Sequence, residues 1–221
     1  MSIYAIGDVH GCLTSLKTVF DHQTFSKDDT ILFLGDYVDR GADSKGVIDW
    51  LIEQSSVFNF IFIKGNHDIM MLNARSDQRD LFRWLQFGGE ETLDSYAIER
   101  GAEWMNQIPS DHWKFLENSR PYFEYSDKIF VHAGLEPGIP PHEQSDQALY
   151  WDKYIEPEMY QSGRVVVSGH TARKNGEIAN FGHTICIDTY CYGGMWLSCL
   201  NVDTLEYLKA NESGKVVRGR L

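Results

Sequence analysis

The sequence contains little positive charge and no long apolar run. Its 221 residues include 20 lysines and arginines against 32 aspartates and glutamates, which gives a formal net charge of −12 at neutral pH. Nucleic acids and anionic membranes attract basic surfaces, so this charge balance argues against both as partners. No apolar stretch approaches the ~20 residues of a membrane-spanning helix. A phosphorylated substrate stays compatible with the acidic chain, because bound metal ions can reverse the sign of the local field.

The chain also lacks the cysteine pairs that typify zinc-binding and redox motifs. None of its four cysteines belongs to a C-x-x-C pair, and their spacing matches no zinc pattern. We expect them to be small buried residues in a reducing compartment. The first residues lead directly into an apolar stretch, without the basic segment and apolar core of a secretory signal, so a cytoplasmic protein is expected. The cysteines are Cys12, Cys186, Cys191 and Cys199.

What the sequence does contain is a series of short apolar runs that each end beside a side chain able to bind a metal ion. Runs of this length, rich in β-branched and aromatic residues, are typical of buried strands. In an α/β sheet, ligands bind at the loops that follow the carboxyl ends of the strands. We therefore expect these loops to bring Asp, His and Asn side chains to one edge of one sheet. The five motifs are GDVHG at 7–11, GDYVDRG at 35–41, GNHD at 65–68, HAG at 132–134 and GHT at 169–171.

The order of the expected strands and helices predicts two sheets flanked by helices. In the first third, strands alternate with helices expected at 13–20 and 44–54, and such units form parallel strands with right-handed crossovers. Residues 68–118 are expected to be mostly helical, with their tryptophans packed in the core, and the residues from Gly214 onward are expected to fray. The prediction is an α/β (α+β) fold, a two-sheet β-sandwich flanked by helices, in a single domain over 1–221. Later strands are expected at 122–125, 128–131, 164–168, 183–187, 195–202 and 205–209.

Six side chains in these motifs form a candidate metal-binding set. Asp8 and His10 lie two residues apart, and in an extended backbone such residues project to the same side. The carboxylate of Asp36 can bridge two ions. A mixture of oxygen and nitrogen ligands suits manganese, iron or zinc better than calcium, which prefers oxygen alone. Two divalent ions outweigh two carboxylates and one hydroxide, so such a site keeps a net positive charge that attracts phosphate. The six are Asp8, His10, Asp36, Asn66, His132 and His170.

Each motif taken alone has a structural explanation. A single GDxHG can form a turn in which glycine adopts a positive φ and aspartate caps a helix. A single HAG or GHT carries less weight still, because a lone histidine is more often structural than a metal ligand. Five motifs in this order, each after a strand, favour a metal centre instead. A second GHT contains His183, which we expect to be structural, because it is His170 that follows the strand at 164–168.

The motif set resembles that of the calcineurin-like metallophosphoesterases, and specifically of the phosphoprotein phosphatases that include bacterial and phage serine/threonine phosphatases. The matching residues run from Gly7 to Thr171 and so cover most of the chain. The resemblance implies a β-sandwich flanked by helices and two metal ions that share Asp36. It implies that the first ion is bound by Asp8, His10 and Asp36, and the second by Asp36, Asn66, His132 and His170.

The resemblance also implies which residues hold and cleave the phosphate group. Arg40 would grip the phosphate oxygens together with Asn66 and His67. His67 would also protonate the leaving group, with Asp39 orienting its ring.

One position departs from the resemblance. Relatives carry a second phosphate-binding arginine shortly after a tryptophan, where this chain has Lys153 in the sequence YWDK. Lysine supplies a point charge without a bidentate fork, so the grip on the phosphate is expected to be weaker or differently arranged. Lys153 is the expected substitute for that arginine, and Arg164 is the less favoured one.

The function implied by the resemblance is the hydrolysis of phosphate monoesters. A hydroxide held between two metal ions, with manganese preferred over iron or zinc, would attack phosphorus in line with the leaving group. No cysteine or serine lies in a motif typical of a nucleophile that forms a phosphoenzyme. The expected enzyme is a serine/threonine or dual-specificity protein phosphatase that acts on a phosphoprotein or phosphopeptide, with a small phosphorylated metabolite as a further substrate class.

Two alternatives stay open at the level of sequence. The nearer is a hydrolase of dinucleoside polyphosphates such as diadenosine tetraphosphate, which shares the fold and most motifs. Asp68 is in its favour, whereas His10 argues against it, because those relatives tend to carry glutamine there. The second is an inactive phosphate-binding adaptor, which should have lost some ligands or the pair of His67 and Asp39. This chain keeps all of them.

Overall fold

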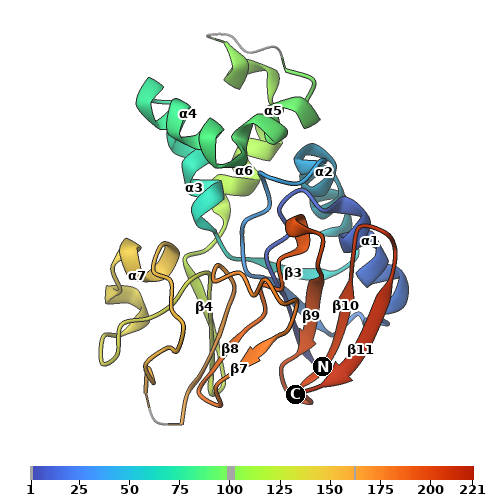
Figure 1. Cartoon of the computed structure of the whole chain (residues 1–221), viewed down its shortest axis with the longest axis vertical. Helices are drawn as coiled ribbons and strands as arrows, with labels where there is room; N and C mark the ends of the chain where they lie inside the picture. Colours follow the sequence, from blue (N-terminus) through green and yellow to red (C-terminus); the bar gives the residue numbers. More distant parts are fainter. Residues whose placement is uncertain (1, 99–102, 162) are drawn as a thin grey trace.

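Two β-sheets lie face to face in the computed structural model, which describes residues 2–98, 103–161 and 163–221 (Figure 1). Within this part of the chain, the first sheet has six strands and the second has five. In spatial order, the first sheet consists of β11 (Val216–Arg220), β10 (Glu206–Ala210), β9 (Leu197–Asn201), β1 (Ile3–Ile6), β2 (Thr30–Phe33) and β3 (Asn59–Phe62). The second consists of β4 (Tyr122–Tyr125), β5 (Lys128–Val131), β6 (Val165–Ser168), β8 (Thr184–Cys186) and β7 (Ala179–Asn180).

The parallel strands β1, β2 and β3 form one side of the first sheet. β1 pairs with β2 from Ile3 opposite Thr30 to Ile6 opposite Phe33, and β3 joins the other side of β2, also in parallel. The connections contain α1 (Leu13–His22) and α2 (Ser44–Gln54), which agree with the helices predicted from apolar spacing. The carboxyl ends of these three strands therefore lie at one edge of the sheet.

The two faces of the first sheet bury different cores. Along β2 and its extension, Leu32 and Leu34 belong to the core between the sheets, where Phe130 of β5 also lies. Ile31 and Phe33 belong to the core beneath the helices. Side chains alternate between the faces of a strand, so a strand buried on both faces reads as a continuous apolar run. This is why the sequence predicts the strand β2.

The second sheet presents its own parallel strands to the same region. β5 pairs in parallel with β6, and β6 with β8, while β4 and β7 are antiparallel edge strands. His132 directly follows β5, and His170 lies two residues beyond β6. The short helix α7 (Asp146–Tyr150) packs on the outer face of this sheet. The predicted α/β fold with two sheets flanked by helices is confirmed.

A helical segment lies beside the strand ends, at the top of Figure 1. It contains α3 (Asn66–Asn73), α4 (Gln78–Trp84), α5 (Glu90–Ser95) and α6 (Ser110–Asn118), with a π-helical turn over Leu85–Gly89 between α4 and α5. The rings of Trp84, Trp104 and Trp113 contact one another in series, at centroid distances of 5.1 and 5.8 Å. All three are buried, which confirms their predicted place in the core. Residues 99–102 of the predicted helical stretch lie outside the described residues. Among the described helices, none combines the length and the apolar character needed to cross a bilayer.

The C-terminal end differs from the prediction that it frays. β11 pairs with β10 in antiparallel register, from Ala210 opposite Val216 to Glu206 opposite Arg220. The side-chain oxygen of Asn211 accepts hydrogen bonds from the backbone N–H groups of Ser213 and Lys215, and so closes the hairpin turn. An Asn followed by Gly three residues later is a turn signal, and the sequence reading overlooked it.

Candidate metal centre

The six predicted metal ligands come together at one edge of the sandwich, between the two sheets. Asp8 and His10 come from the loop after β1, and Asp36 from the loop after β2. Asn66 begins α3, immediately after β3 and its short connection. From the second sheet, His132 and His170 complete the group.

Asp36 lies at the middle of this cluster. Its Oδ2 atom is 3.3 Å from Nε2 of His10 and 3.5 Å from Nε2 of His132. The same Nε2 of His132 is 2.9 Å from Oδ1 of Asn66. The carboxylate oxygens of Asp8 accept from the backbone N–H of His170 at 3.0 and 3.2 Å, which joins the first sheet to the second.

Backbone carbonyls fix which nitrogen each histidine turns toward the cluster. Nδ1 of His10 donates to the carbonyl of Val38 at 2.9 Å, and Nδ1 of His132 donates to that of Leu34 at 2.7 Å. Their Nε2 atoms are therefore left as acceptors facing Asp36. His170 is turned the other way: its Nε2 donates to the carbonyl of Trp151 at 3.1 Å, so Nδ1 is its ligand atom.

Histidines in this cluster are held neutral. Burial lowers the pKa of His10 and of His132, and it lowers that of His170 to about 3. A neutral imidazole is the form that binds a metal ion. With His132 neutral, its Nε2 and Oδ1 of Asn66 are two acceptors that face each other, an arrangement that a shared cation satisfies.

Buried carboxylates crowd the other side of the cluster. Burial raises the pKa of Asp8, and the charges of Asp188 and Asp36 raise it further. Asp188, which the sequence reading did not select, has its pKa raised to about 6, chiefly by burial. Burial also opposes ionisation of Asp36, whereas positive charge at the position of the surrounding imidazoles, that of His132 above all, lowers its pKa below the usual range. Crowded carboxylates beside neutral imidazoles fit divalent cations, because a cation offsets the repulsion between like charges.

The prediction that Asp8 and His10 project to the same side of an extended backbone is wrong, although both residues are in the cluster. His10 has a φ of +43°, so the backbone turns there and is not extended. Its N–H donates to the carbonyl of Asp36 at 2.7 Å, and this bond directs the turn toward the loop after β2. Contacts between loops, and not the alternation of a strand, place the His10 side chain.

The predicted pair of His67 and Asp39 is present and fully buried. Nδ1 of His67 is 2.7 Å from Oδ2 of Asp39, which leaves Nε2 of the ring available to a substrate. Asp39 also accepts from Nε1 of Trp84 and from Oγ1 of Thr92, each at 2.8 Å. Trp84 belongs to α4 and Thr92 to α5, so the helical segment supplies two supports that no motif revealed.

A further carboxylate, Asp68, ties the loops together. Its oxygens accept from the backbone N–H groups of Gly65 at 2.8 Å and of Asp36 and Tyr37 at 3.0 Å. Asp68 therefore holds the loops after β2 and β3 in register beneath the cluster. Sequence reasoning treated it only as a weak indicator of substrate class.

Arg40 lies at the cluster, held by an aromatic ring that the sequence reading missed. Its Nη1 donates to Nε2 of His10 at 3.0 Å, and its guanidinium lies 4.5 Å from the ring centroid of Tyr192. The Tyr192 ring also meets His10 edge-on at 4.7 Å. Tyr192 follows the last predicted motif by more than 20 residues, and only the tertiary structure brings it to Arg40.

The two candidates for a second phosphate-binding residue differ in position. Burial is the main cause of the pKa shifts of His170 and Asp188. The positive charge of Lys153 lowers both pKa values as well, so Lys153 lies near the cluster. Arg164 pairs with Glu124 at 2.8 Å on β4, outside the cluster. His183 also lies outside it, with Nδ1 3.1 Å from Oγ1 of Thr184. Lys153 therefore remains the candidate, and Arg164 does not.

Residues 1–174 match the calcineurin-like phosphoesterase family. The chain is similar to the symmetrical bis(5'-nucleosyl)-tetraphosphatase of Pseudomonas fluorescens, with 28% identity over 162 residues, which are 71% of this chain and 48% of that enzyme. It is also similar to serine/threonine-protein phosphatase 1 of Salmonella typhimurium, with 33% identity over 89 residues, which are 40% of this chain and 39% of that enzyme. The chain thus spans about half the length, or less, of these curated relatives.

A solved structure proposed to be a diadenosine tetraphosphatase aligns with a TM-score of 0.68 and 22% identity, over 99% of this chain and 92% of that one. At this identity the likeness shows a shared fold, and it agrees with the two-sheet architecture described above.

Proposed function

The chain belongs to the calcineurin-like phosphoesterase family, and we propose that it hydrolyses dinucleoside tetraphosphates symmetrically, releasing two nucleoside diphosphates. The observation that carries this proposal is the similarity to a symmetrical bis(5'-nucleosyl)-tetraphosphatase over 71% of the chain. The alignment with a structure proposed to be a diadenosine tetraphosphatase, over 99% of the chain, is consistent with it.

This proposal favours the alternative substrate over the phosphoprotein expected first from the motifs. Similarity to the Salmonella protein phosphatase extends over 40% of the chain, against 71% for the tetraphosphatase. His10 weighed against a dinucleotide substrate, but one residue carries less weight than a match over 162 residues. A protein phosphatase remains the second candidate, supported by the 33% identity within that shorter match.

The donor set suits two divalent cations that share Asp36. In this assignment Asp8 and His10 complete one site, while Asn66, His132 and His170 complete the other. When bound, such ions act as Lewis acids on phosphoryl oxygens and lower the pKa of the attacking water. Manganese is the proposed metal, with iron or zinc as alternatives, because the ligands mix oxygen and nitrogen.

The surrounding side chains hold the phosphate and move the proton. Arg40, positioned over Tyr192, donates hydrogen bonds to phosphate oxygens. His67, as the imidazolium, gives a proton from Nε2 to the leaving nucleoside diphosphate, while Asp39 accepts from Nδ1 and stabilises the charged ring. Lys153 adds positive charge on the side of His170, where further phosphates of a tetraphosphate chain need neutralising.

Both sheets supply parts of this proposed site. Asp8 and Asp36 come from loops of the first sheet, and His132 and His170 from loops of the second. We therefore treat 1–221 as one catalytic domain.

The proposal predicts which substrate the manganese-loaded protein prefers. We expect kcat/KM for diadenosine tetraphosphate to exceed that for phosphoserine and phosphothreonine peptides by at least about tenfold, since the phosphate-binding groups extend beyond a single phosphate. Products are separated by anion-exchange chromatography, and ADP should be the only nucleotide formed early in the reaction. The Asp36→Asn variant is the control for contaminating activity.

Two results would argue against the proposed substrate. Equal amounts of AMP and ATP would mean asymmetric cleavage. Faster turnover of phosphopeptides than of the dinucleotide would instead favour the protein phosphatase.

A further inference from the structure

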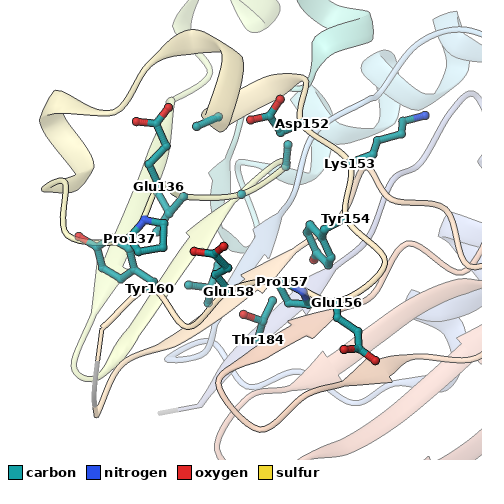
Figure 2. A pocket seen from close by; sticks show the side chains of 15 residues that line it. Glu136, Pro137, Asp152, Lys153, Tyr154, Glu156, Pro157, Glu158, Tyr160 and Thr184 are labelled. Carbon is teal, nitrogen blue, oxygen red and sulfur yellow. The ribbon is translucent and has the colours of Figure 1, made fainter.

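A cavity of about 270 Å³ lies on the outer face of the second sheet, under the chain segment 134–161 (Figure 2). Val166 of β6 and Thr184 of β8 contribute to its lining from the sheet. The covering segment contributes aromatic rings, prolines and carboxylates. The most prominent of these side chains are Glu136, Pro137, Tyr154, Pro157, Glu158 and Tyr160.

The cavity shares two of its walls with the metal centre. One wall contains Ala133 and Gly134, which directly follow the ligand His132. The other contains Asp152 and Lys153, which directly follow Trp151, and the carbonyl of Trp151 accepts from His170.

Lys153 lines the cavity and lies two residues after Trp151, whose carbonyl accepts from the candidate ligand His170. Figure 2 shows its side chain extending away from the cavity, and its charge acts on His170 and Asp188 of the centre. A ligand with one end in the cavity and the other at the cluster therefore passes Lys153.

The lining suits an uncharged group and repels phosphate. Four carboxylates, those of Glu136, Asp152, Glu156 and Glu158, contribute to it. Glu136 accepts from Oγ of Ser145 at 2.9 Å and Asp152 from Nε2 of Gln147 at 2.7 Å. The Glu158 carboxylate has no hydrogen-bond partner within the described part of the chain, and it points into the cavity in Figure 2. Acceptors of this kind pair with hydroxyl and amino groups.

We propose that this cavity is a nucleoside subsite, which receives the base and ribose of one half of a dinucleoside tetraphosphate while the phosphates lie at the metal centre. The proposal rests on the proposed function. Tyr154 and Tyr160 provide flat apolar surface for the base. Glu158 accepts hydrogen bonds from ribose hydroxyl or base amino groups, and Lys153 contacts the phosphates next to the ribose. Binding sites for small molecules combine mostly apolar walls with a few polar groups, as this cavity does.

Gly134 allows the cavity to be narrowed with little disturbance of the backbone. A Cβ atom added there meets only the carbonyl oxygen of Ala148, at 3.9 Å, which is ordinary contact. We expect Gly134→Leu to lower the ratio of kcat/KM for diadenosine tetraphosphate to kcat/KM for p-nitrophenyl phosphate by at least about tenfold. The second compound reports on the metal centre, because it carries no nucleoside.

Glu158→Gln tests the acceptor without changing the shape of the cavity. It should lower the same ratio by about threefold to tenfold, the loss expected when a hydrogen bond to a charged acceptor is replaced by a weaker one. Glu143→Gln is the matched control, because Glu143 is an exposed carboxylate in the same covering segment and lies beside His142. It should leave the ratio as in the unmodified protein.

Adenosine binding tests the nucleoside subsite independently of the proposed catalytic function. Titration calorimetry with adenosine and metal-free protein should give binding heat that Gly134→Leu removes. If the protein does not cleave diadenosine tetraphosphate but still binds adenosine in this way, the proposed function fails and the subsite stands. If it cleaves the dinucleotide while both variants keep the normal ratio and adenosine heat, the subsite proposal is overturned. A selective loss of basic phosphopeptide turnover in both variants would also overturn it, in favour of a peptide groove.

Discussion

At the scale of single residues, the candidate centre consists of groups that are costly to bury without a cation. Desolvation opposes ionisation of Asp8 and Asp188, and it keeps His132 neutral beside the acceptor oxygen of Asn66. Such perturbed groups concentrate at functional sites, where their pKa values serve the chemistry. His67 differs in that its ring pairs through Nδ1 with Asp39, which is not a candidate ligand, whereas only its backbone N–H donates to Asp36.

His67→Asn should therefore affect proton transfer and leave metal binding intact. We expect turnover of an alkyl phosphate such as phosphoserine peptide to fall about 10²–10⁴-fold, the usual scale for loss of a general acid. The loss should be smaller for p-nitrophenyl phosphate, whose leaving group needs little protonation. Steady-state kinetics on both substrates, with metal content measured by elemental analysis, provide the check. Equal loss on the two substrates would contradict the role of His67.

At the scale of elements, the helical segment shapes the site from outside the sheets. The π-helical turn over Leu85–Gly89 brings Gly88 against Arg40, whose backbone N–H donates to the carbonyl of Gly88 at 3.1 Å. Gly88 has a φ of +113°, which residues with a side chain rarely adopt. A Cβ atom there would lie 2.7 Å from Cγ of Arg40 and 2.8 Å from its N. The turn therefore holds the phosphate-binding arginine in place.

Gly88→Ala should displace Arg40 as well as strain the backbone. We expect a loss in the free energy of unfolding of about 1–3 kcal/mol, the cost of an unfavourable backbone conformation, and a raised KM for phosphorylated substrates. Gly138→Ala is the matched control: Gly138 has a φ of +79°, but nothing lies within 4 Å of an added Cβ. It should lose stability without a change in KM. A normal KM in both variants would show that the turn does not position Arg40.

At the scale of the whole molecule, the metal centre joins the two sheets. Its candidate ligands come from loops of the first sheet and of the second, and the bond from the His170 N–H to Asp8 crosses between them. An ion bound at this junction stabilises the folded chain, because the unfolded chain does not assemble the ligands.

Metal removal should therefore lower the thermal stability of the entire chain. We expect Tm to fall when EDTA is added and to recover with manganese, which at a concentration 100 times its Kd adds about 2.7 kcal/mol to the free energy of unfolding. Differential scanning calorimetry measures the change, and Asp36→Asn should reduce it. The same manganese-induced rise in Asp36→Asn as in the unmodified protein would remove Asp36 from the centre.

The strands and the identities of the clustered side chains could be predicted from the sequence. Each candidate ligand lies within four residues of the end of a strand. All of these strands except the half-exposed β3 are largely buried, and such burial leaves a continuous apolar run in the sequence. The turn at His10 and the hairpin of β11 were predicted wrongly. Their geometry depends on hydrogen bonds to Asp36 and within the turn at Asn211, which a reading of strand alternation does not include.

The sequence alone determined which residue types reach the edge of the sheets, because a strand and the loop after it are local in the chain. Only the tertiary structure decided how those residues are supported. Trp84 and Thr92 reach Asp39 from the helical segment, and Tyr192 reaches Arg40 from the loop before β9. The cavity beside Lys153 likewise forms only where a long segment folds over the second sheet. Contacts of this kind depend on how distant elements pack, and packing leaves no periodic signal in the sequence.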